Sequence, residues 1–396
     1  MSEPPIDNAV SAATPVPALP AIAVAPPASV ARVVAAERLI DVMRGFAALL
    51  VAYYHCRQVT WIGMESFSRY HMSLTHPGAI AAWLTLPVAW GSAGVPVFFV
   101  ISGYCIHRSN ASRLFTNPQY RLDTREFLLR RFVRIYPALV AALVLTFVAD
   151  SISLSLSPVS HKILSIGPGP FLVNLLSLQG VAGRTYGSNG ALWTLSLEVQ
   201  FYLFYPLVFA LRRRFGMARV VAGVAVLNAV SAVLLERHQI TFFPSYWLSW
   251  MLGAWIAEAR IEGRKASPFA YPVAAIVAAA GCAAYHFGQF GAFQLWSIAF
   301  ACFFFKALSQ RWPAFVTGSP ITWAMSKIGD FSYSLYLIHL PIFVLIGSLL
   351  YRSALQFSIW PSFVLTLAML PIAWTFWFCF ERPAVKVARR LRRKAA

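Results

Sequence analysis

The sequence predicts an all-α fold, a polytopic membrane helical bundle with about ten transmembrane helices. Of its 396 residues, 59% are hydrophobic and only 12% are charged, which is about half the charged share of an average soluble domain. Apolar runs of roughly 20 residues recur along the chain, and a helix needs this length to cross a bilayer. All five cysteines lie in or beside these runs, and their odd number favours free thiols over a disulfide framework.

The ten predicted helices are apolar segments that are separated by more polar connections. In chain order they cover residues 39–60, 88–107, 131–149, 192–211, 218–235, 242–259, 269–287, 292–309, 331–350 and 360–380. A shorter apolar piece at 170–179 is expected to lie in the membrane interface or to fold back.

The charges of the connecting segments predict the orientation of this bundle. If the N-terminus is cytoplasmic, the segments alternate between the two sides, and 27 of the 33 Lys and Arg residues fall on the cytoplasmic side against 6 outside. Cytoplasmic loops of membrane proteins carry such an excess of positive charge. The asymmetry therefore accounts for the net charge of +19 without any nucleic-acid partner, and it predicts that both termini are cytoplasmic.

The two ends of the chain differ from the region between them. Residues 1–36 are rich in Ala, Pro and Val and lack the basic start and apolar core of a signal peptide, so we expect a disordered cytoplasmic N-terminal tail. Residues 37–382 form the predicted ten-span membrane domain. Residues 383–396 form a basic cytoplasmic tail that would contact anionic lipid of the inner leaflet.

The first predicted helix, RLIDVMRGFAALLVAYYHCRQV, carries three ionisable side chains in an apolar setting. Arg44 and His55 lie within roughly 20° of the same helix face and about 16 Å apart along its axis. Asp41, one turn before Arg44, joins this face. Because hydrocarbon penalises such groups, we expect the face to line the bundle interior or a water-filled cavity. The alternatives are an Asp41–Arg44 ion pair at the headgroup level and a hydrogen-bonded structural His55.

Three arginines lie at the start of the third predicted helix, in the stretch RRFVRIYP. Arg131 and Arg134 share a face because they are three residues apart. They are either ordinary charges that orient the helix or, with Arg130 and Arg44, a clamp for phosphate groups. A thioester donor such as acyl-coenzyme A has a phosphate-bearing head joined to its sulfur by a long narrow arm. A basic cytoplasmic rim would hold that head while the arm reaches a base deeper in the bundle.

A carboxylate lies inside the fourth predicted helix, in the stretch SNGALWTLSLEVQFYLFYP. Glu198 lies at a depth similar to that of His55, and Tyr202 is on the same side of the helix. A lone carboxylate in a membrane span is costly unless it is paired. Glu198 would therefore orient an imidazole or bind a sugar hydroxyl, unless it only forms a hydrogen bond between helices.

The ninth predicted helix carries a second histidine near mid-membrane, in the stretch FSYSLYLIHLP. His339 has hydroxyl neighbours that include Tyr336, so it is either a substrate or supporting contact or a structural histidine. Two long outer segments, at 61–87 and 150–191, are either covers of an acceptor site or purely structural. No Cys/His spacing typical of a zinc site occurs, and we predict no metal.

These stretches, taken in order, resemble the membrane-bound acyltransferase-3 family from residue 38 to about 381. The family's arginine–ten residues–histidine motif falls on Arg44 and His55, and its RxxR motif on Arg131 and Arg134. The stretches FFVISG, W-x-L-S-x-E-x-x-F-Y and YSLYLIH also match. Each motif is weak alone, and the ordered set is specific.

The resemblance implies a bacterial inner-membrane O-acyltransferase. Acyl-coenzyme A, most simply acetyl-coenzyme A, would be the donor, and a hydroxyl of an extracytoplasmic carbohydrate or glycolipid the acceptor. It makes His55 catalytic and places Arg44, Arg131 and Arg134 at the donor site. We extend these expectations to a catalytic role for Glu198, donor contacts from Arg130 and Asp41, and substrate contacts from His339, Tyr202, Tyr336 and Trp193.

Two questions stay open on the sequence alone. His55 either deprotonates the acceptor hydroxyl as a general base or accepts the acyl group covalently. The rival function is a transporter of an envelope precursor or a small anionic solute, in which Asp41, Arg44, His55 and Glu198 form a substrate or proton path. The sequence does not predict the oligomeric state.

Overall fold

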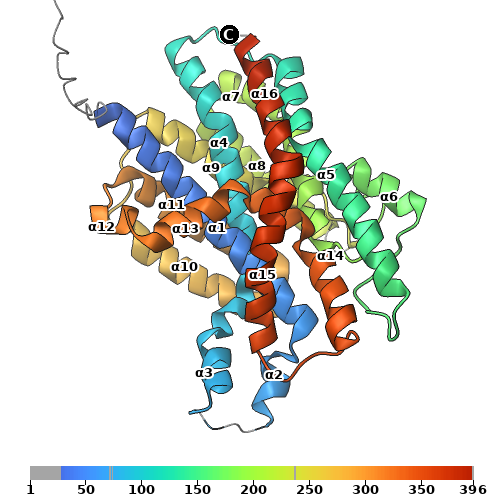
Figure 1. Ribbon diagram of the computed structural model, residues 1–396. Coiled ribbons are helices and arrows are strands. Elements are labelled where there is room, and N and C mark those ends of the chain that lie inside the picture. Colours follow the sequence, from blue (N-terminus) through green and yellow to red (C-terminus); the bar gives the residue numbers. More distant parts are fainter. Residues whose placement is uncertain (1–27, 71–72, 74, 236–237, 395–396) are drawn as a thin grey trace, which may run out of the picture.

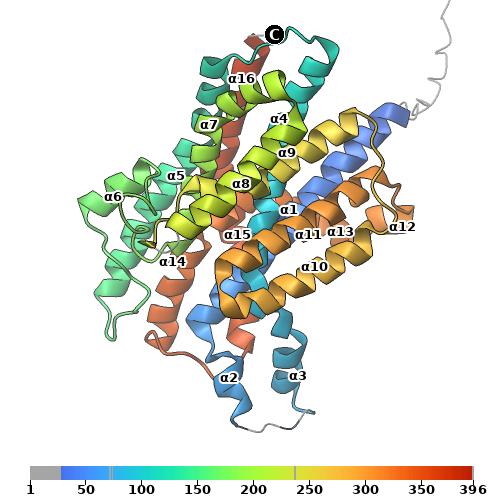
Figure 2. The ribbon, with the colours of Figure 1, turned by 180° about the vertical axis from the view of Figure 1, so that it is seen from behind.

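The computed structural model describes residues 28–70, 73, 75–235 and 238–394, and within them the fold is all-α. Figure 1 and, from behind, Figure 2 show the helices gathered in one bundle. Two isolated β-bridges occur, between Trp61 and Gln356 and between Gln179 and Gly183. The predicted class, an all-α polytopic helical bundle, is confirmed.

The helices follow the predicted order, with several short additions between the spans. The longer ones are α1 (Ala28–Thr60), α4 (Gly94–Thr116), α5 (Thr124–Leu154), α7 (Trp193–Phe215), α8 (Met217–Leu235), α9 (Trp247–Ile261), α10 (Ala270–Ala284), α11 (Gln289–Ser309), α13 (Pro320–Asp330), α14 (Ser332–Tyr351), α15 (Trp360–Phe376) and α16 (Arg382–Lys394). The shorter ones are α2 (Gly63–Ser68), α3 (Pro77–Leu84), α6 (Pro168–Leu175) and α12 (Ala314–Thr317).

Nine helices of the described part of the chain are long and apolar enough to cross a membrane. They correspond to nine of the ten predicted spans. The remaining one, predicted at 242–259, is α9, an α-helix of only 15 residues. It packs against α4, α8 and α11, and Trp250, Met251 and Ala254 on it are fully buried. Because neighbouring helices enclose α9, it does not have to match the thickness of a bilayer with its own apolar surface.

The start of α1 corrects one prediction. The disordered tail was expected to reach residue 36, but α1 already begins at Ala28. Residues 28–36, ASVARVVAA, contain no proline or glycine, so nothing in them stops a helix once the last proline, at position 27, is passed. The rest of the predicted tail, residues 1–27, lies outside the described residues.

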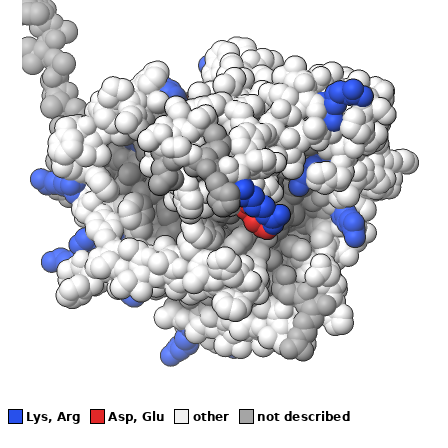
Figure 3. Space-filling model, turned by 90° about the horizontal axis from the view of Figure 1, so that it is seen from below, with Lys and Arg blue, Asp and Glu red and all other residues white. Residues whose placement is uncertain are grey.

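The predicted C-terminal tail is helical as far as Lys394. A π-helical turn at Trp377–Glu381 joins α15 to α16, and α16 packs against α5. In Figure 1, α16 lies at the same end of the molecule as the ends of α4 and α7, whereas α2 and α3 lie at the opposite end. Viewed from the side of α2 and α3, the surface is mostly uncharged, with scattered basic side chains and a small acidic patch (Figure 3).

Two close helix crossings position the polar face of α1 and the middle of α4. A Cβ on Gly45 would lie 1.9 Å from the backbone oxygen of Met325, and one on Gly329 would lie 2.0 Å from that of Asp41. The backbones of α1 and α13 are therefore in direct contact. Gly103 of α4 similarly lies against the backbone of Trp250 in α9. Small residues allow such contacts between membrane helices, and any larger side chain here would push the helices apart.

Candidate active site

The structure brings the two predicted mid-membrane histidines together, although they are 284 positions apart in the chain. Nδ1 of His55 lies 2.8 Å from Nε2 of His339. Nδ1 of His339 lies 3.0 Å from the backbone oxygen of Leu335. A carbonyl oxygen can only accept, so Nδ1 of His339 carries the proton and its Nε2 accepts from His55. In the neutral pair, Nε2 of His55 is therefore left with a free lone pair, which is the form of a base.

His55 also lines a cavity of about 230 Å³, which we call the His55 hollow. One side of the hollow comes from α1 and α14. The opposite side comes from the second long segment, 150–191. This segment therefore lies over His55, as a cover of an acceptor site would. The lining residues are His55, Gln58, Val59, Lys162, Leu164, Thr185, Gly187, Ser188, Gly190 and Leu340.

A buried carboxylate holds this covering segment in place. Asp150 at the end of α5 accepts hydrogen bonds from the backbone N–H of Ser188 at 2.7 Å and from its hydroxyl at 2.6 Å. Asn189 donates to the backbone oxygen of Leu337 at 2.8 Å. Gly187 has a φ of 54°, and a Cβ there would lie 2.0 Å from the Asp150 carboxylate. The wall of the hollow is thus tied to α5 and α14 by buried polar contacts, which are costly to break.

The predicted donor arginines meet around one cysteine. Arg44 of α1 and Arg131 and Arg134 of α5 all interact electrostatically with the thiol of Cys105 in α4. The Arg131 guanidinium lies 5.6 Å from the centre of the Tyr202 ring, a cation–π distance that fixes its position. Among the described residues, neither Arg131 nor Arg134 has a carboxylate within ion-pair distance.

The other two predicted donor residues are held by local partners. Asp41 lies 3.7 Å from Arg44, at the distance of a loose ion pair. Arg130 pairs with Glu126 one turn earlier on α5. Local pairing of this kind is the ordinary behaviour of charges four residues apart on a helix. The structure therefore places Arg131, Arg134 and Arg44 together and leaves Arg130 paired on its own helix.

The arginines surround a space that water can enter. Cys105 is exposed, although many protein atoms surround it, the charges of several arginines among them. Arg131, Arg134 and Tyr333 are likewise surrounded by protein but partly accessible. Accessible side chains in such surroundings line a cleft or a cavity. We call this space, bounded by Arg44, Cys105, Arg131, Arg134 and Tyr333, the arginine chamber.

Glu198 belongs to the arginine chamber more than to the His55 hollow. Its carboxylate accepts a hydrogen bond from the hydroxyl of Ser102 at 3.2 Å and another from that of Tyr202. Its charge also acts on Arg131 and Arg134. The group that contacts the His55 imidazole is His339, not Glu198. A catalytic role of Glu198 stays a prediction.

The three predicted substrate-contact aromatics do not line the His55 hollow. The Tyr336 hydroxyl accepts from Thr194 at 2.7 Å, and its ring lies 5.9 Å from that of His339. Trp193 packs edge-on against Tyr246 at 5.5 Å. Tyr202 lies between Glu198 and Arg131, as described above. Direct substrate contact by any of these rings stays a prediction.

The helix face between the two spaces is closed. Ala48 and Ala52 lie between Arg44 and His55 on the polar face of α1, and each is 1% exposed. A water-sized probe therefore does not pass along this face. The sequence predicted that one polar face carries both groups, and the structure adds that small side chains occupy the interval.

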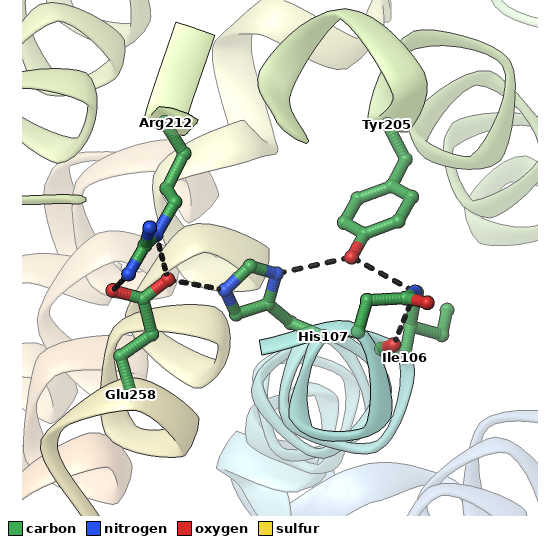
Figure 4. Close-up of polar contacts among 6 residues, drawn as sticks. Ile106, His107, Tyr205, Arg212 and Glu258 are labelled. Carbon is green, nitrogen blue, oxygen red and sulfur yellow. Dashed lines mark hydrogen bonds and ion pairs between the residues drawn. The ribbon is translucent and has the colours of Figure 1, made fainter. Parts of the chain in front are cut away.

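A third polar cluster was not predicted from the sequence (Figure 4). His107 of α4 is fully buried, with Nε2 2.8 Å from the carboxylate of Glu258 in α9 and Nδ1 3.0 Å from the hydroxyl of Tyr205 in α7. Arg212 of α7 donates to both oxygens of Glu258. Both His107 and Glu258 lie within predicted spans, and an ionisable residue inside a span was the available signal. Because every partner is satisfied, the cluster ties α4, α7 and α9 together.

No metal site was predicted from the sequence, and the grouping of possible ligand side chains bears on this prediction. Among the described residues, no three His, Cys, Asp or Glu side chains are grouped closely enough to hold a metal ion. The His55 hollow and the arginine chamber bring together arginines, aromatic rings, hydroxyls and a pair of imidazoles. Such groups suit an anionic ligand in the arginine chamber and proton transfer in the His55 hollow.

Several known proteins are similar to this chain. A protein of Acidianus two-tailed virus that is named as an acetyltransferase is 27% identical over 212 residues, 52% of this chain and 53% of its own length. O-acetyltransferase OatA of Staphylococcus aureus is 27% identical over 205 residues, 45% of this chain and 29% of OatA. Acyltransferase MdmB of Streptomyces mycarofaciens is 25% identical over 358 residues, 84% of this chain and 86% of MdmB. The chain thus spans about half or less of the length of the first two relatives. No solved structure matches it.

A family comparison covers much more of the chain. The family model described as an acyltransferase domain matches residues 38–378, from the first turns of α1 to the π-helical turn after α15. This region contains every residue of the His55 hollow and of the arginine chamber. The chain, a multi-pass membrane protein, belongs to the acyltransferase-3 family.

Proposed function

We propose that this protein is an O-acyltransferase that takes an acyl group from acyl-coenzyme A in the arginine chamber. It transfers the group to a hydroxyl of an extracytoplasmic carbohydrate or glycolipid in the His55 hollow. The proposal is carried by the occurrence together of two arginines that have no carboxylate within ion-pair distance among the described residues and an imidazole whose Nε2 is free. The names of OatA and MdmB support acyl transfer over the rival function of a transporter.

The sides of the membrane follow from the charge distribution. Counted along the predicted topology, 27 Lys and Arg residues fall on the side of the N-terminus and 6 on the other. The ends of α4 and α7 and helix α16 lie at one end of the molecule (Figure 1), and the last turn of α7 and the sequence of α16 are rich in arginine. We place this end in the cytoplasm, where acyl-coenzyme A is made, and we place the His55 hollow toward the outside of a bacterial inner membrane. Acetyl is the group that the name of OatA favours.

The reaction at His55 is a proton transfer coupled to acyl transfer. Nε2 of His55 removes the proton of the acceptor hydroxyl while the oxygen attacks the thioester carbonyl carbon. The carbon–sulfur bond then breaks, and the departing sulfur takes the proton back from Nε2. In the covalent alternative, Nε2 attacks the carbonyl carbon, and the carbon–sulfur bond breaks to release the coenzyme A thiolate. The acceptor oxygen then attacks the acyl carbon, the bond from that carbon to Nε2 breaks, and the hydroxyl proton replaces the one that the thiolate takes up. Both routes need a neutral His55 at the start, so activity falls as the pH drops through the pKa of His55.

The two spaces have to connect for this reaction, because Ala48 and Ala52 close the face of α1 between them. The pantetheine arm of coenzyme A is narrow and long enough to cover the axial separation of Arg44 and His55, about 16 Å. We propose that donor binding opens a passage between α1 and its neighbours.

Cys105 offers a direct test of the donor site, because its thiol lies among the arginines and is accessible. In a variant whose other four cysteines are replaced, we expect an anionic, membrane-impermeant methanethiosulfonate reagent to modify Cys105 from the cytoplasmic side of oriented vesicles. Saturating coenzyme A should slow the modification at least tenfold, because its phosphates occupy the same arginines. Dephospho-coenzyme A should protect less well. Modification at an unchanged rate with bound coenzyme A would place the donor elsewhere.

His339 is a positioning residue for His55. It acts by accepting the hydrogen bond from Nδ1 of His55, which leaves Nε2 of His55 as the base. His339→Leu removes the acceptor of the His55 proton, so we expect the turnover number to fall by about a hundredfold. His339→Gln can present an amide oxygen to the same proton and should recover most of that loss. Coenzyme A protection of Cys105 should be unchanged in both variants. Equal loss in the two variants would show that His339 acts by packing alone.

A further inference from the structure

A second basic cavity lies away from both proposed reaction spaces. It has a volume of about 460 Å³ and lies where the end of α7, the start of α8 and the end of α9 meet. Four arginines and two glutamates line it: Arg212, Arg213, Arg219, Arg264, Glu258 and Glu262. Neither His55 nor the arginines of the arginine chamber contribute to it. We call it the α7–α9 cavity.

The charges of this cavity do not cancel. Glu258 is engaged by Arg212 and His107 (Figure 4), and Glu262 lies 2.6 Å from Arg264. Arg213 and Arg219 have no carboxylate partner within the part of the chain that the structure describes. Arg219 donates only a long bond of 3.4 Å to the backbone oxygen of Phe215. Two positive charges therefore face a concave space.

The cavity opens beside a helix whose surface suits lipid. Only 22% of the apolar window of α8 is buried, and its exposed side chains are apolar: Val226, Leu227, Val230, Val233 and Leu234. Phe215 at the rim of the cavity is 43% exposed. Acyl chains can therefore lie along α8 while a headgroup at its basic end enters the cavity. A free phosphate would gain the charge contacts but none of this apolar contact.

We propose that the α7–α9 cavity binds the phosphate-bearing headgroup of an anionic phospholipid. Basic pockets between membrane helices are the usual form of such sites. The cavity shares Arg212 and Glu258 with the buried cluster around His107. A bound headgroup would thus brace the contact of α7 and α9 with α4, the helix that carries Cys105. The site is independent of the acyl-transfer proposal.

The test compares thermal unfolding of the full-length protein in lipid nanodiscs of defined composition. We expect phosphatidylglycerol, added to phosphatidylcholine discs, to raise the midpoint of unfolding, and native mass spectrometry to show a retained lipid. In the double variant Arg213→Gln/Arg219→Gln, the affinity for phosphatidylglycerol should fall about thirtyfold, since each charge contributes about 1 kcal/mol to anionic lipid binding.

Two controls distinguish lipid binding in the cavity from the effect of general surface charge and from the binding of free phosphate. Arg214→Gln/Lys265→Gln removes two charges from the same end of the molecule, but neither residue lines the cavity. An equal loss of affinity in this control would overturn the site. Coenzyme A stabilises the protein from the arginine chamber under the proposed function, so what decides is the effect of the double variant. In discs of phosphatidylcholine alone, any stabilisation by coenzyme A or inorganic phosphate should be the same in Arg213→Gln/Arg219→Gln as in the unmodified protein. If the double variant loses it, the cavity is a site for a soluble phosphate and the lipid assignment is wrong.

Discussion

A His55→Ala variant is expected to lose acyl transfer by a factor between about 10² and 10⁴ while its binding of coenzyme A is unchanged. His55 is the imidazole that lines the His55 hollow. Its Nδ1 is committed to His339, so Nε2 is the atom available for the proton of the acceptor. Alanine removes this base, and the donor arginines, which do not line the His55 hollow, are untouched. Transfer of radiolabelled acetyl groups to envelope glycans measures the loss, and protection of Cys105 measures the binding.

The matched control is His238→Ala, because His238 is exposed and lines neither space. Activity should be unchanged in this variant. Retained acyl transfer in His55→Ala would remove the catalytic assignment, whatever the result for His339. Loss of coenzyme A binding together with activity would point instead to a folding defect or to a donor role for His55.

The same variant helps to distinguish the two routes. With acetyl-coenzyme A but no acceptor, a covalent route releases one coenzyme A per protein and leaves an acyl group on His55, which hydroxylamine would remove. A general-base route releases none beyond slow hydrolysis. His55→Ala should abolish any such burst. Falling pH should slow both routes, because the proton that His55 gains occupies the nitrogen that either route uses.

Much of the fold was predictable because hydropathy and charge are local properties of a membrane chain. Nine of the ten predicted spans reappear with shifted ends. The length of α9 was not predictable, because its apolar side chains meet α4, α8 and α11 and not lipid. The crossing of α1 by α13 was not predictable either. It depends on Gly45 and Gly329, each of which faces the backbone of the other helix. The sequence shows each glycine only within its own segment.

The site was predictable only as far as single helices. Periodicity placed Arg44 and His55 on one face of α1, but it cannot say which helix that face meets. The partner of His55 therefore remained unknown, and Glu198, at a similar depth, was one candidate for it. The His55–His339 contact and the buried Asp150–Ser188 contact both join residues from separate segments of the chain. Such pairs follow from tertiary packing, on which a single sequence carries no local signal.

The second large effect is expected at the donor site, in the double variant Arg131→Gln/Arg134→Gln. Both guanidiniums are enclosed, and in the described residues neither has a carboxylate within ion-pair distance, so an anionic ligand is the natural partner. A hydrogen bond to a charged group contributes about 1.5–3 kcal/mol. Losing two such contacts should weaken coenzyme A binding by a factor between about 10² and 10⁴. The KM for acetyl-coenzyme A should rise accordingly.

The comparison that decides the role of these arginines uses donors with and without phosphates. S-acetylpantetheine carries the same thioester but no phosphate, so the double variant should use it nearly as well as the unmodified protein does. Arg121→Gln/Arg125→Gln is the matched control, because it removes two exposed charges from the segment leading into α5 and from its first turn. If the Arg131/Arg134 variant lost both donors equally, the arginines would serve the acyl group or the fold, and the phosphate-binding assignment would be wrong. A loss confined to the phosphorylated donor requires the arginine chamber to be the place where the coenzyme head is held.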